Sequence, residues 1–275
     1  MIFENLLSSA HSLVLNDLLD RCSIIQPSID IETVKTVAIS AAKATNAGTP
    51  LPEHLMALLD KWYTSLQSGQ PDYTVYGNDL YIAELWACWK VYSRTHLLNI
   101  QKTKCLPGGS ISGAHSGAKK IVDLGCGFAY TTAAIKQIFP NATVYGTNID
   151  GTLQMEVARG MAKDYGFTMG DDPGAVAGET DIVFASEYFE HIDRPIQHLD
   201  YIIETLQPSA MLIANAFGTT AIGHFHDYWV YENENFPAVP ARQASKIFNQ
   251  RMKYHGFTNV KTKLWNNRPT YWVKI

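Results

Sequence analysis

The stretch that most constrains the fold is IVDLGCGFAYTTAAIKQIFP, residues 121–140. An apolar run carries an acid at Asp123, two glycines follow at Gly125 and Gly127, and a helical pattern continues until Pro140. Glycine lets a backbone turn tightly and approach a ligand, whereas proline ends a helix. The order is typical of a strand, a tight turn and a helix, with a ligand site at the carboxyl end of the strand.

From Lys120 onward, short apolar runs alternate with helical patterns. Strands are expected at 120–124, 142–148, 167–169, 181–186 and 210–216, followed by a closing pair, most simply antiparallel, in 258–265 and 270–275. Alternation of strands and helices is typical of a mainly parallel sheet with helices on both faces. The predicted fold class is therefore α/β, with a seven-stranded, mainly parallel, doubly wound sheet.

The first hundred residues carry helical patterns instead. Leu51, Leu55, Leu58 and Trp62 share one helical face, and a tryptophan-rich helix is expected around 79–92. The segment 106–120 is rich in Gly and Ser and has no periodicity, which is typical of a linker. We therefore expect a helical N-terminal region in residues 1–112 and an α/β domain in residues 113–275.

The composition limits the classes of protein to consider. Hydrophobic residues make up 46% of the 275 residues and charged residues 17%, which supports a large core. The net charge of −4 gives no strong nucleic-acid signal. The four cysteines form no CxxC pair, and no apolar run is long enough to span a membrane. A cytoplasmic protein with reduced thiols and no membrane partner is the expectation.

A dinucleotide site is the first candidate for the glycine turn. Its fingerprint needs a third glycine, G-x-G-x-x-G, so that the helix can approach the pyrophosphate. Tyr130 stands at that third position and would impede the approach. A nicotinamide-dependent oxidoreductase is therefore disfavoured.

Three motifs in order carry a more specific resemblance. VDLGCGFA, VYGTNID and DIVFASEYFEHIDRPIQHLDYIIETLQPSAMLIANAFG together resemble the class I S-adenosylmethionine-dependent methyltransferases, over residues 119–218. The resemblance implies a Rossmann-like methyltransferase domain, with S-adenosyl-L-methionine as cofactor and S-adenosyl-L-homocysteine as product.

The resemblance also implies which residues bind the cofactor. Asp123 would orient the turn or meet the methionine amino group, and the stretch Gly125, Cys126 and Gly127 would pass under the methionine part. An acid that closes the second strand would accept bonds from the ribose hydroxyls. In this chain Asn148 stands at that position and the acid follows at Asp150.

Two further cofactor contacts are implied on neighbouring strand ends. Asp171 or Asp172, after the short third strand, could meet the adenine amino group. Glu187, after the fourth strand, would line the cofactor pocket and is a catalytic candidate. His191 is the candidate base, because histidine titrates near neutrality, although it could also cap the next helix.

The segment 218–236 is long for a connection and is expected to shape a substrate pocket. Together with Tyr188, its substrate-binding candidates are His224, His226 and Tyr228. A histidine pair beside an acid can also bind metal, but methyl transfer from a sulfonium needs none, so no metal is expected.

In the N-terminal region, Tyr76 and Arg94 lie on either side of the tryptophan-rich segment. An aromatic ring and an arginine there could close over the sulfonium and pair with the methionine carboxylate. The helix could equally serve only to pack on the sheet, or to form a homodimer.

The acceptor is expected to be an O, N or C nucleophile of a small molecule or peptide. The [D/N]-P-P-[Y/F] stretch of amino-methylating DNA enzymes is absent, since residues 186–189 are SEYF. A non-catalytic relative that acts as an interaction module stays open as an alternative, and the oxidoreductase is a less favoured one.

Overall fold

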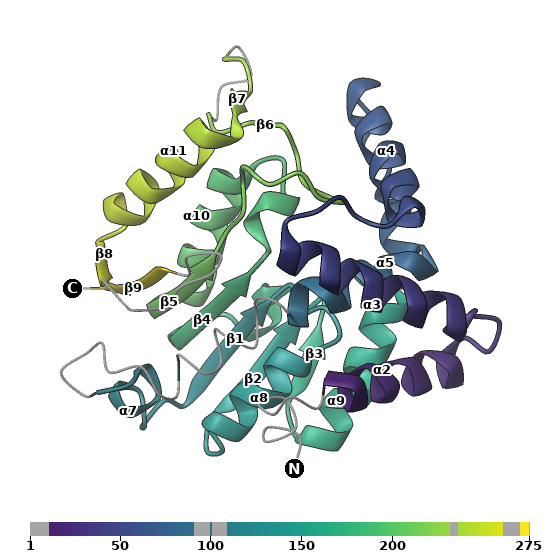
Figure 1. Ribbon diagram of the computed structural model, residues 1–275. Coiled ribbons are helices and arrows are strands. Elements are labelled where there is room, and N and C mark those ends of the chain that lie inside the picture. The colour runs from purple at the N-terminus through teal and green to yellow at the C-terminus, as the bar shows by residue number, and fades with distance from the viewer. Residues whose placement is uncertain (1–10, 91–99, 101–108, 232–235, 261–269, 275) are drawn as a thin grey trace.

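A computed structural model of the chain describes residues 11–90, 100, 109–231, 236–260 and 270–274. In these residues a seven-stranded sheet has the order β3-β2-β1-β4-β5-β9-β8 (Figure 1). Strand β9 runs antiparallel to both of its neighbours, whereas the other paired strands are parallel. The strands are β1 Lys120–Leu124, β2 Thr143–Thr147, β3 Thr168–Gly170, β4 Thr180–Ser186, β5 Pro208–Ala214, β8 Phe257–Val260 and β9 Thr270–Lys274.

This sheet confirms the predicted fold class. Strand β1 has the predicted bounds, because its apolar residues are buried on both faces between β2 and β4. Strand β5 begins two residues earlier than expected, at Pro208. Proline is tolerated there because it occupies the first position of the strand. The antiparallel closing pair is β8 and β9.

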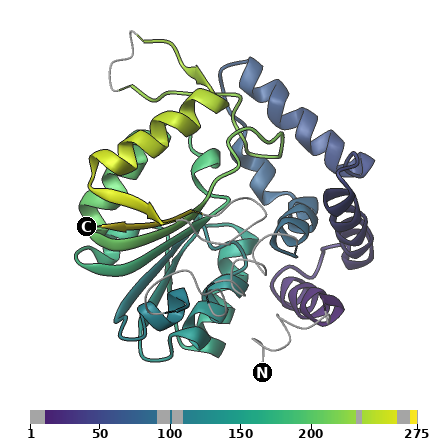
Figure 2. The ribbon, with the colours of Figure 1, turned by 60° about the vertical axis from the view of Figure 1, so that its left-hand side comes forward.

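Helices cover both faces of the sheet, as the alternation of elements requires. Helices α8 and α9 pack together next to β2 and β3, whereas α10 and α11 pack together on the other side (Figure 2). The helices are α8 Tyr130–Ile138, α9 Leu153–Tyr165, α10 Pro195–Leu206 and α11 Ala241–Tyr254.

The N-terminal region is helical, as expected. Its elements are α2 His11–Ile25, α3 Ile31–Ala47, α4 Glu53–Gln67, the 3₁₀ turn η1 Tyr73–Gly77 and α5 Asp79–Cys88. Helix α2 packs on α9, and α3 packs on α5. One hydrophobic core runs from these helices into the sheet.

The predicted linker contains a short helix. Helix α7, Ile111–Ala114, lies inside it, starts at a Ser110 cap that accepts from Gly113 N at 3.0 Å, and buries Ile111. The boundary expected between residues 112 and 113 falls within this helix, and the division into two domains stays a prediction.

Trp62 fixes the distance between α4 and the segment 219–226, which runs from β5 toward the small β6–β7 ribbon (Asp227–Tyr228 and Val239–Pro240). Its side chain is fully buried, its Nε1 donates to the His224 carbonyl at 2.7 Å, and its ring meets Phe225 edge-on. The helical region and this segment are thereby joined over the carboxyl end of the sheet.

Nothing among the described helices combines the length and the apolar character that crossing a bilayer would require.

Truncation of Trp62 tests the importance of this junction. We expect Trp62→Ala to lower the free energy of unfolding by about 3–5 kcal/mol, as loss of a buried tryptophan does. The half-exposed Trp229 is the matched control, and Trp229→Ala should stay within about 0.5 kcal/mol of wild type. Urea denaturation measures both, and equal effects of the two substitutions would contradict this role.

Candidate active site

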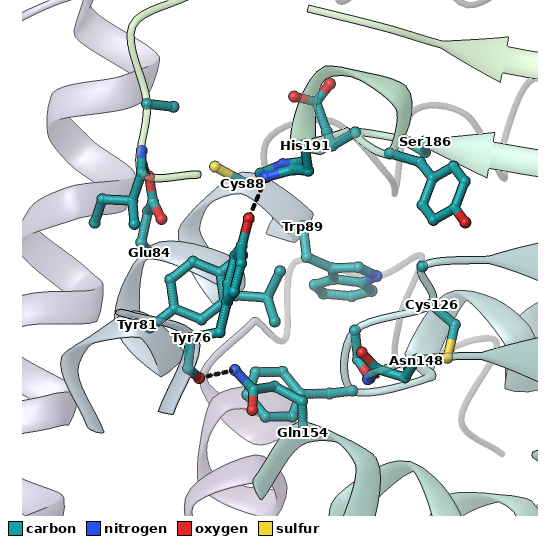
Figure 3. A pocket seen from close by; sticks show the side chains of 18 of the residues that line it. Tyr76, Tyr81, Glu84, Cys88, Trp89, Cys126, Asn148, Gln154, Ser186 and His191 are labelled. Atoms are coloured by element: carbon teal, nitrogen blue, oxygen red, sulfur yellow. Dashed lines mark hydrogen bonds between the residues drawn. The ribbon is translucent and has the colours of Figure 1, made fainter. Parts of the chain in front are cut away.

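One cavity of about 590 Å³ lies at the carboxyl ends of β1, β2 and β4. Its floor is the glycine turn after β1, and its roof comes from α5, η1 and the segment 219–224. Figure 3 shows the ring of Trp89 in the space between Tyr76 of the roof and Cys126 of the turn. Open α/β sheets bind ligands in this position, outside the carboxyl ends of parallel strands.

The turn depends on glycine at both positions. Gly125 has φ 62° and Gly127 has φ 56°, the left-handed region in which side chains are strained. A Cβ on Gly125 would collide with the Tyr188 ring, and one on Gly127 would lie 3.2 Å from Leu85. The turn therefore presents bare backbone to the cavity, as the sequence predicts.

The end of β2 holds the turn in place. Gly125 N donates to Thr147 Oγ1 at 3.1 Å, and Cys126 N donates to the Thr147 carbonyl at 2.9 Å. The Asn148 amide donates to the Gly127 carbonyl at 2.7 Å and accepts from Ile149 N at 2.8 Å. An aspartate could not donate the first of these bonds, which gives a structural reason for asparagine where the resemblance implies an acid.

Asp123 is buried beside the turn and accepts from Thr132 Oγ1 at 2.6 Å. Burial raises the pKa of its carboxyl group to about 7, although the Thr132 bond opposes the rise. A cationic group of a ligand in the cavity would favour the ionised form.

The turn after β4 supplies the other wall. Glu187 has φ 53°, a left-handed conformation that is unusual for a residue other than glycine, and it lines the cavity beside Tyr188 and His191. The Tyr76 hydroxyl lies 3.1 Å from His191 Nδ1, the bond drawn in Figure 3. Burial, followed by the nearby His224, lowers the pKa of His191 well below its ordinary value, so the ring is neutral near pH 7.

Three neighbouring acids carry raised pKa values; Glu84 and Glu190 are buried, and Glu187 is partly exposed to the cavity. Burial raises the pKa of Glu84 to about 8 and that of Glu190 to about 7. For Glu187, burial and the neighbouring Glu190 raise the pKa well above the usual range. Sequence reasoning missed Glu84 and Glu190. Glu84 could have been found as a charge on the apolar face that also carries Tyr81 and Cys88.

The cavity brings most of the predicted site residues together. Its lining includes Tyr76, Asp123, Gly125, Cys126, Gly127, Asn148, Asp171, Glu187, Tyr188, His191 and His224. It also includes Gln154, which was not predicted; the Gln154 amide donates to the Tyr76 carbonyl at 2.8 Å (Figure 3).

Three candidates lie elsewhere. The Asp150 carboxylate is exposed and pairs with Arg159 at 2.8 Å. The His226 ring stacks on Tyr63 at 4.2 Å between centroids, and the buried Tyr228 hydroxyl donates to the Glu190 carbonyl at 3.0 Å. None of these three lines the cavity. Arg94 lies outside the described residues.

The strand order decides the family of folds. A parallel β3-β2-β1-β4-β5 core is extended by an antiparallel β9 inserted before β8, with the glycine turn after β1; this is the seven-stranded, mainly parallel sheet that the resemblance implies. The chain has the class I methyltransferase fold. Tyr130 fits this assignment, since its buried side chain stands where a dinucleotide site needs a third glycine and its hydroxyl donates to Asp17 at 2.6 Å.

Comparisons with known proteins name methyltransferases. No protein-family model matches the chain. Malonyl-[acyl-carrier protein] O-methyltransferase of Halalkalibacterium halodurans is 26% identical over 117 residues, which cover 40% of this chain and 43% of that protein. The match thus spans less than half the length of this curated relative.

Two solved structures are similar at low identity. The CurJ carbon methyltransferase has a TM-score of 0.49 and 19% identity, over 80% of this chain and 65% of that one. An O-methyltransferase family protein from Burkholderia thailandensis has a TM-score of 0.48 and 12% identity, over 71% of this chain and 59% of that one.

The raised pKa of Asp123 predicts how stability depends on pH in this methyltransferase fold. Between the ordinary aspartate pKa of about 3.9 and the folded value of about 7, the folded state binds more protons than the unfolded state. The contribution of Asp123 is full below pH 4 and is lost as pH rises through 7. Wild type should therefore lose stability relative to Asp123→Asn over this range.

Urea denaturation of both proteins from pH 4 to 8 measures the difference between their free energies of unfolding. The buried histidines titrate in both proteins, so their contribution cancels in this difference. A difference that stays constant with pH, or changes in the opposite direction, would contradict the raised pKa.

Proposed function

We propose that the chain is an S-adenosylmethionine-dependent methyltransferase that transfers the sulfonium methyl group to an O, N or C nucleophile of a small molecule or peptide. The observation that carries this proposal is the cavity between the glycine turn and the turn after β4. It places the backbone of Gly125 and Gly127 opposite Glu187 and His191. The fold alone would allow a non-catalytic relative, but such a relative has no need of a buried base facing the turn.

In this proposal the glycine turn holds the methionine part of the cofactor, and Asp123 pairs with its amino group. Asp171 and Asn148 line the nucleoside end of the cavity. Asn148 donates its amide proton to the turn, so the ribose needs another acceptor. Gln154 suits this task, because its buried Oε1 receives no hydrogen bond in the described part of the chain.

The bound cofactor supplies an activated methyl group, whose bond to sulfur breaks as the bond to the acceptor forms, with the electron pair going to sulfur. The protein has to align the two partners and exclude water. Such alignment is worth about 7–11 kcal/mol in well-oriented reactions. The roof residues Tyr76, Tyr81 and Trp86, all buried in the helical region, suit this task.

The walls also favour a class of acceptor. Aromatic rings and the acids Glu84, Asp123, Asp171 and Glu187 line the cavity, and its described lining contains no Lys or Arg. A neutral or cationic acceptor suits such walls better than a carboxylate. When the acceptor has a proton to lose, the neutral His191 ring can receive it.

Removal of Asp123 tests cofactor binding. Asp123→Ala should abolish binding of S-adenosylhomocysteine in a calorimetric titration, since the amino group of the ligand loses its partner beside the turn. Glu204→Ala, which changes an exposed acid of α10, should bind as wild type does. Retained micromolar binding by a folded Asp123→Ala protein would contradict the proposal.

Removal of the base tests the chemistry. For an acceptor with an ionisable proton, His191→Asn should lower kcat by about 10²–10⁴-fold, the usual contribution of a general base. The KM for the cofactor should change little, and the pH dependence of kcat should lose one ionisation. An unchanged pH profile would exclude His191 as the base.

A further inference from the structure

A cluster of metal-ligating groups lies at the acceptor side of the cavity. One ligand atom each of Glu187, Glu190 and His224 lies within 4.8 Å of the others. The two glutamates come from the turn after β4, and His224 comes from the segment 219–226 that crosses over it. Glu187 and His224 line the cavity, so the cluster can be reached by a ligand.

Two of the three side chains are held so that one donor atom stays available. His224 Nδ1 lies 2.8 Å from the Thr219 carbonyl, which fixes the proton on Nδ1 and leaves the lone pair on Nε2. Glu190 accepts from Ala216 N at 2.6 Å through Oε1. Metal-binding histidines and carboxylates are usually oriented in this way, by a hydrogen bond between the backbone and the side-chain atom that does not bind the metal.

Two carboxylate oxygens of the cluster have no N–H or hydroxyl donor among the described residues. Glu190 is fully buried, yet its Oε2 receives no hydrogen bond from an N–H or hydroxyl donor in the described part of the chain, and neither does Glu187 Oε1. Buried polar atoms without partners are rare and costly. Without a cation, the two carboxyl groups can avoid repulsion only by sharing a proton.

The backbone at Glu187 has an unusual conformation. Its left-handed φ of 53° is strained for a residue with a side chain, and a bond from its N–H to the Ala214 carbonyl at 2.8 Å maintains it. This conformation brings the Glu187 carboxyl group toward Glu190 rather than along the strand.

We propose that Glu187, Glu190 and His224 bind one divalent first-row metal ion, with zinc or manganese the best suited to the ligands. Two carboxylates and one neutral imidazole are typical ligands of these ions, and three protein ligands leave a coordination position open. That position faces the cavity. The site differs from the histidine pair considered from the sequence, because His226 stacks on Tyr63 and does not join it.

The chemical role of the ion follows from its position at the acceptor side of the cavity. This role rests on the proposed function. An acceptor hydroxyl bound at the open position would lose its proton more easily, since a metal ion lowers the pKa of a bound O–H group. The proton would leave to water. The oxygen then forms its bond to the methyl carbon as the carbon–sulfur bond breaks.

Titration of chelator-stripped, full-length protein with Zn²⁺ and Mn²⁺ in a calorimeter tests the site. Wild type should bind one ion per chain. Glu190→Gln keeps the acceptor for Ala216 N and should weaken binding by at least the roughly 10–100-fold that loss of a supporting partner costs. His226→Gln, which removes a nearby histidine outside the cluster, should bind as wild type does.

Circular dichroism checks that each variant is folded, and Glu187→Gln provides a second ligand variant. Absence of binding by wild type at millimolar metal, or equal binding by wild type and both glutamine variants, would overturn the proposal. A separate titration with S-adenosylhomocysteine distinguishes the two ideas. If that ligand binds while the metals do not, only the metal site fails; if neither binds, the methyltransferase proposal fails too.

Discussion

The contacts between the end of β2 and the glycine turn after β1 are the constraint on which the rest of the site depends. Thr147 receives two backbone N–H groups of the turn, and Asn148 donates to its last glycine. These bonds keep Gly125 and Gly127 in left-handed conformations with their backbone exposed to the cavity. Without these bonds the floor of the cavity would have no fixed shape, and the wall residues would have no fixed position relative to the glycine turn.

The roof buries ionisable groups, which costs free energy of folding. Tyr76 and the segment 219–224 close over the cavity, where Glu84 and Glu190 are buried and Glu187 is partly buried. Burial of carboxyl groups is unfavourable unless a proton or a cation neutralises them. Raised pKa values of several groups in one cleft are typical of functional sites. The same burial that lowers stability near neutral pH therefore prepares the site for a cationic ligand or ion.

Much of the fold could be predicted from the sequence because its signals are local. The apolar run of β1, the two glycines and Pro140 define strand, turn and helix without knowledge of the rest of the chain. The strands and their antiparallel closing pair were predicted, but the order of the strands in the sheet was not, because that order depends on contacts between segments that are distant in sequence. Helix α7 was missed because a four-residue helix leaves no periodicity in a segment rich in glycine and serine.

The site was predicted less completely because its contacts are distant in sequence. No local pattern shows that the Asn148 amide is needed by Gly127, or that Asp150 pairs with Arg159 outside the cavity. His224 and His226 look equivalent in the sequence, yet one faces Glu187 and the other stacks on Tyr63. The crossing of 219–226 over the turn after β4 decides this difference.

The most direct test of the account is a crystal structure of the protein with S-adenosylhomocysteine. The account predicts the homocysteine part above Gly125–Gly127, the adenosine beside Asn148 and Asp171, and the sulfur facing Glu187 and His191. The ligand in the reverse orientation, or bound outside this cavity, would contradict the central claim that the glycine turn holds a nucleoside sulfonium for transfer of its methyl group.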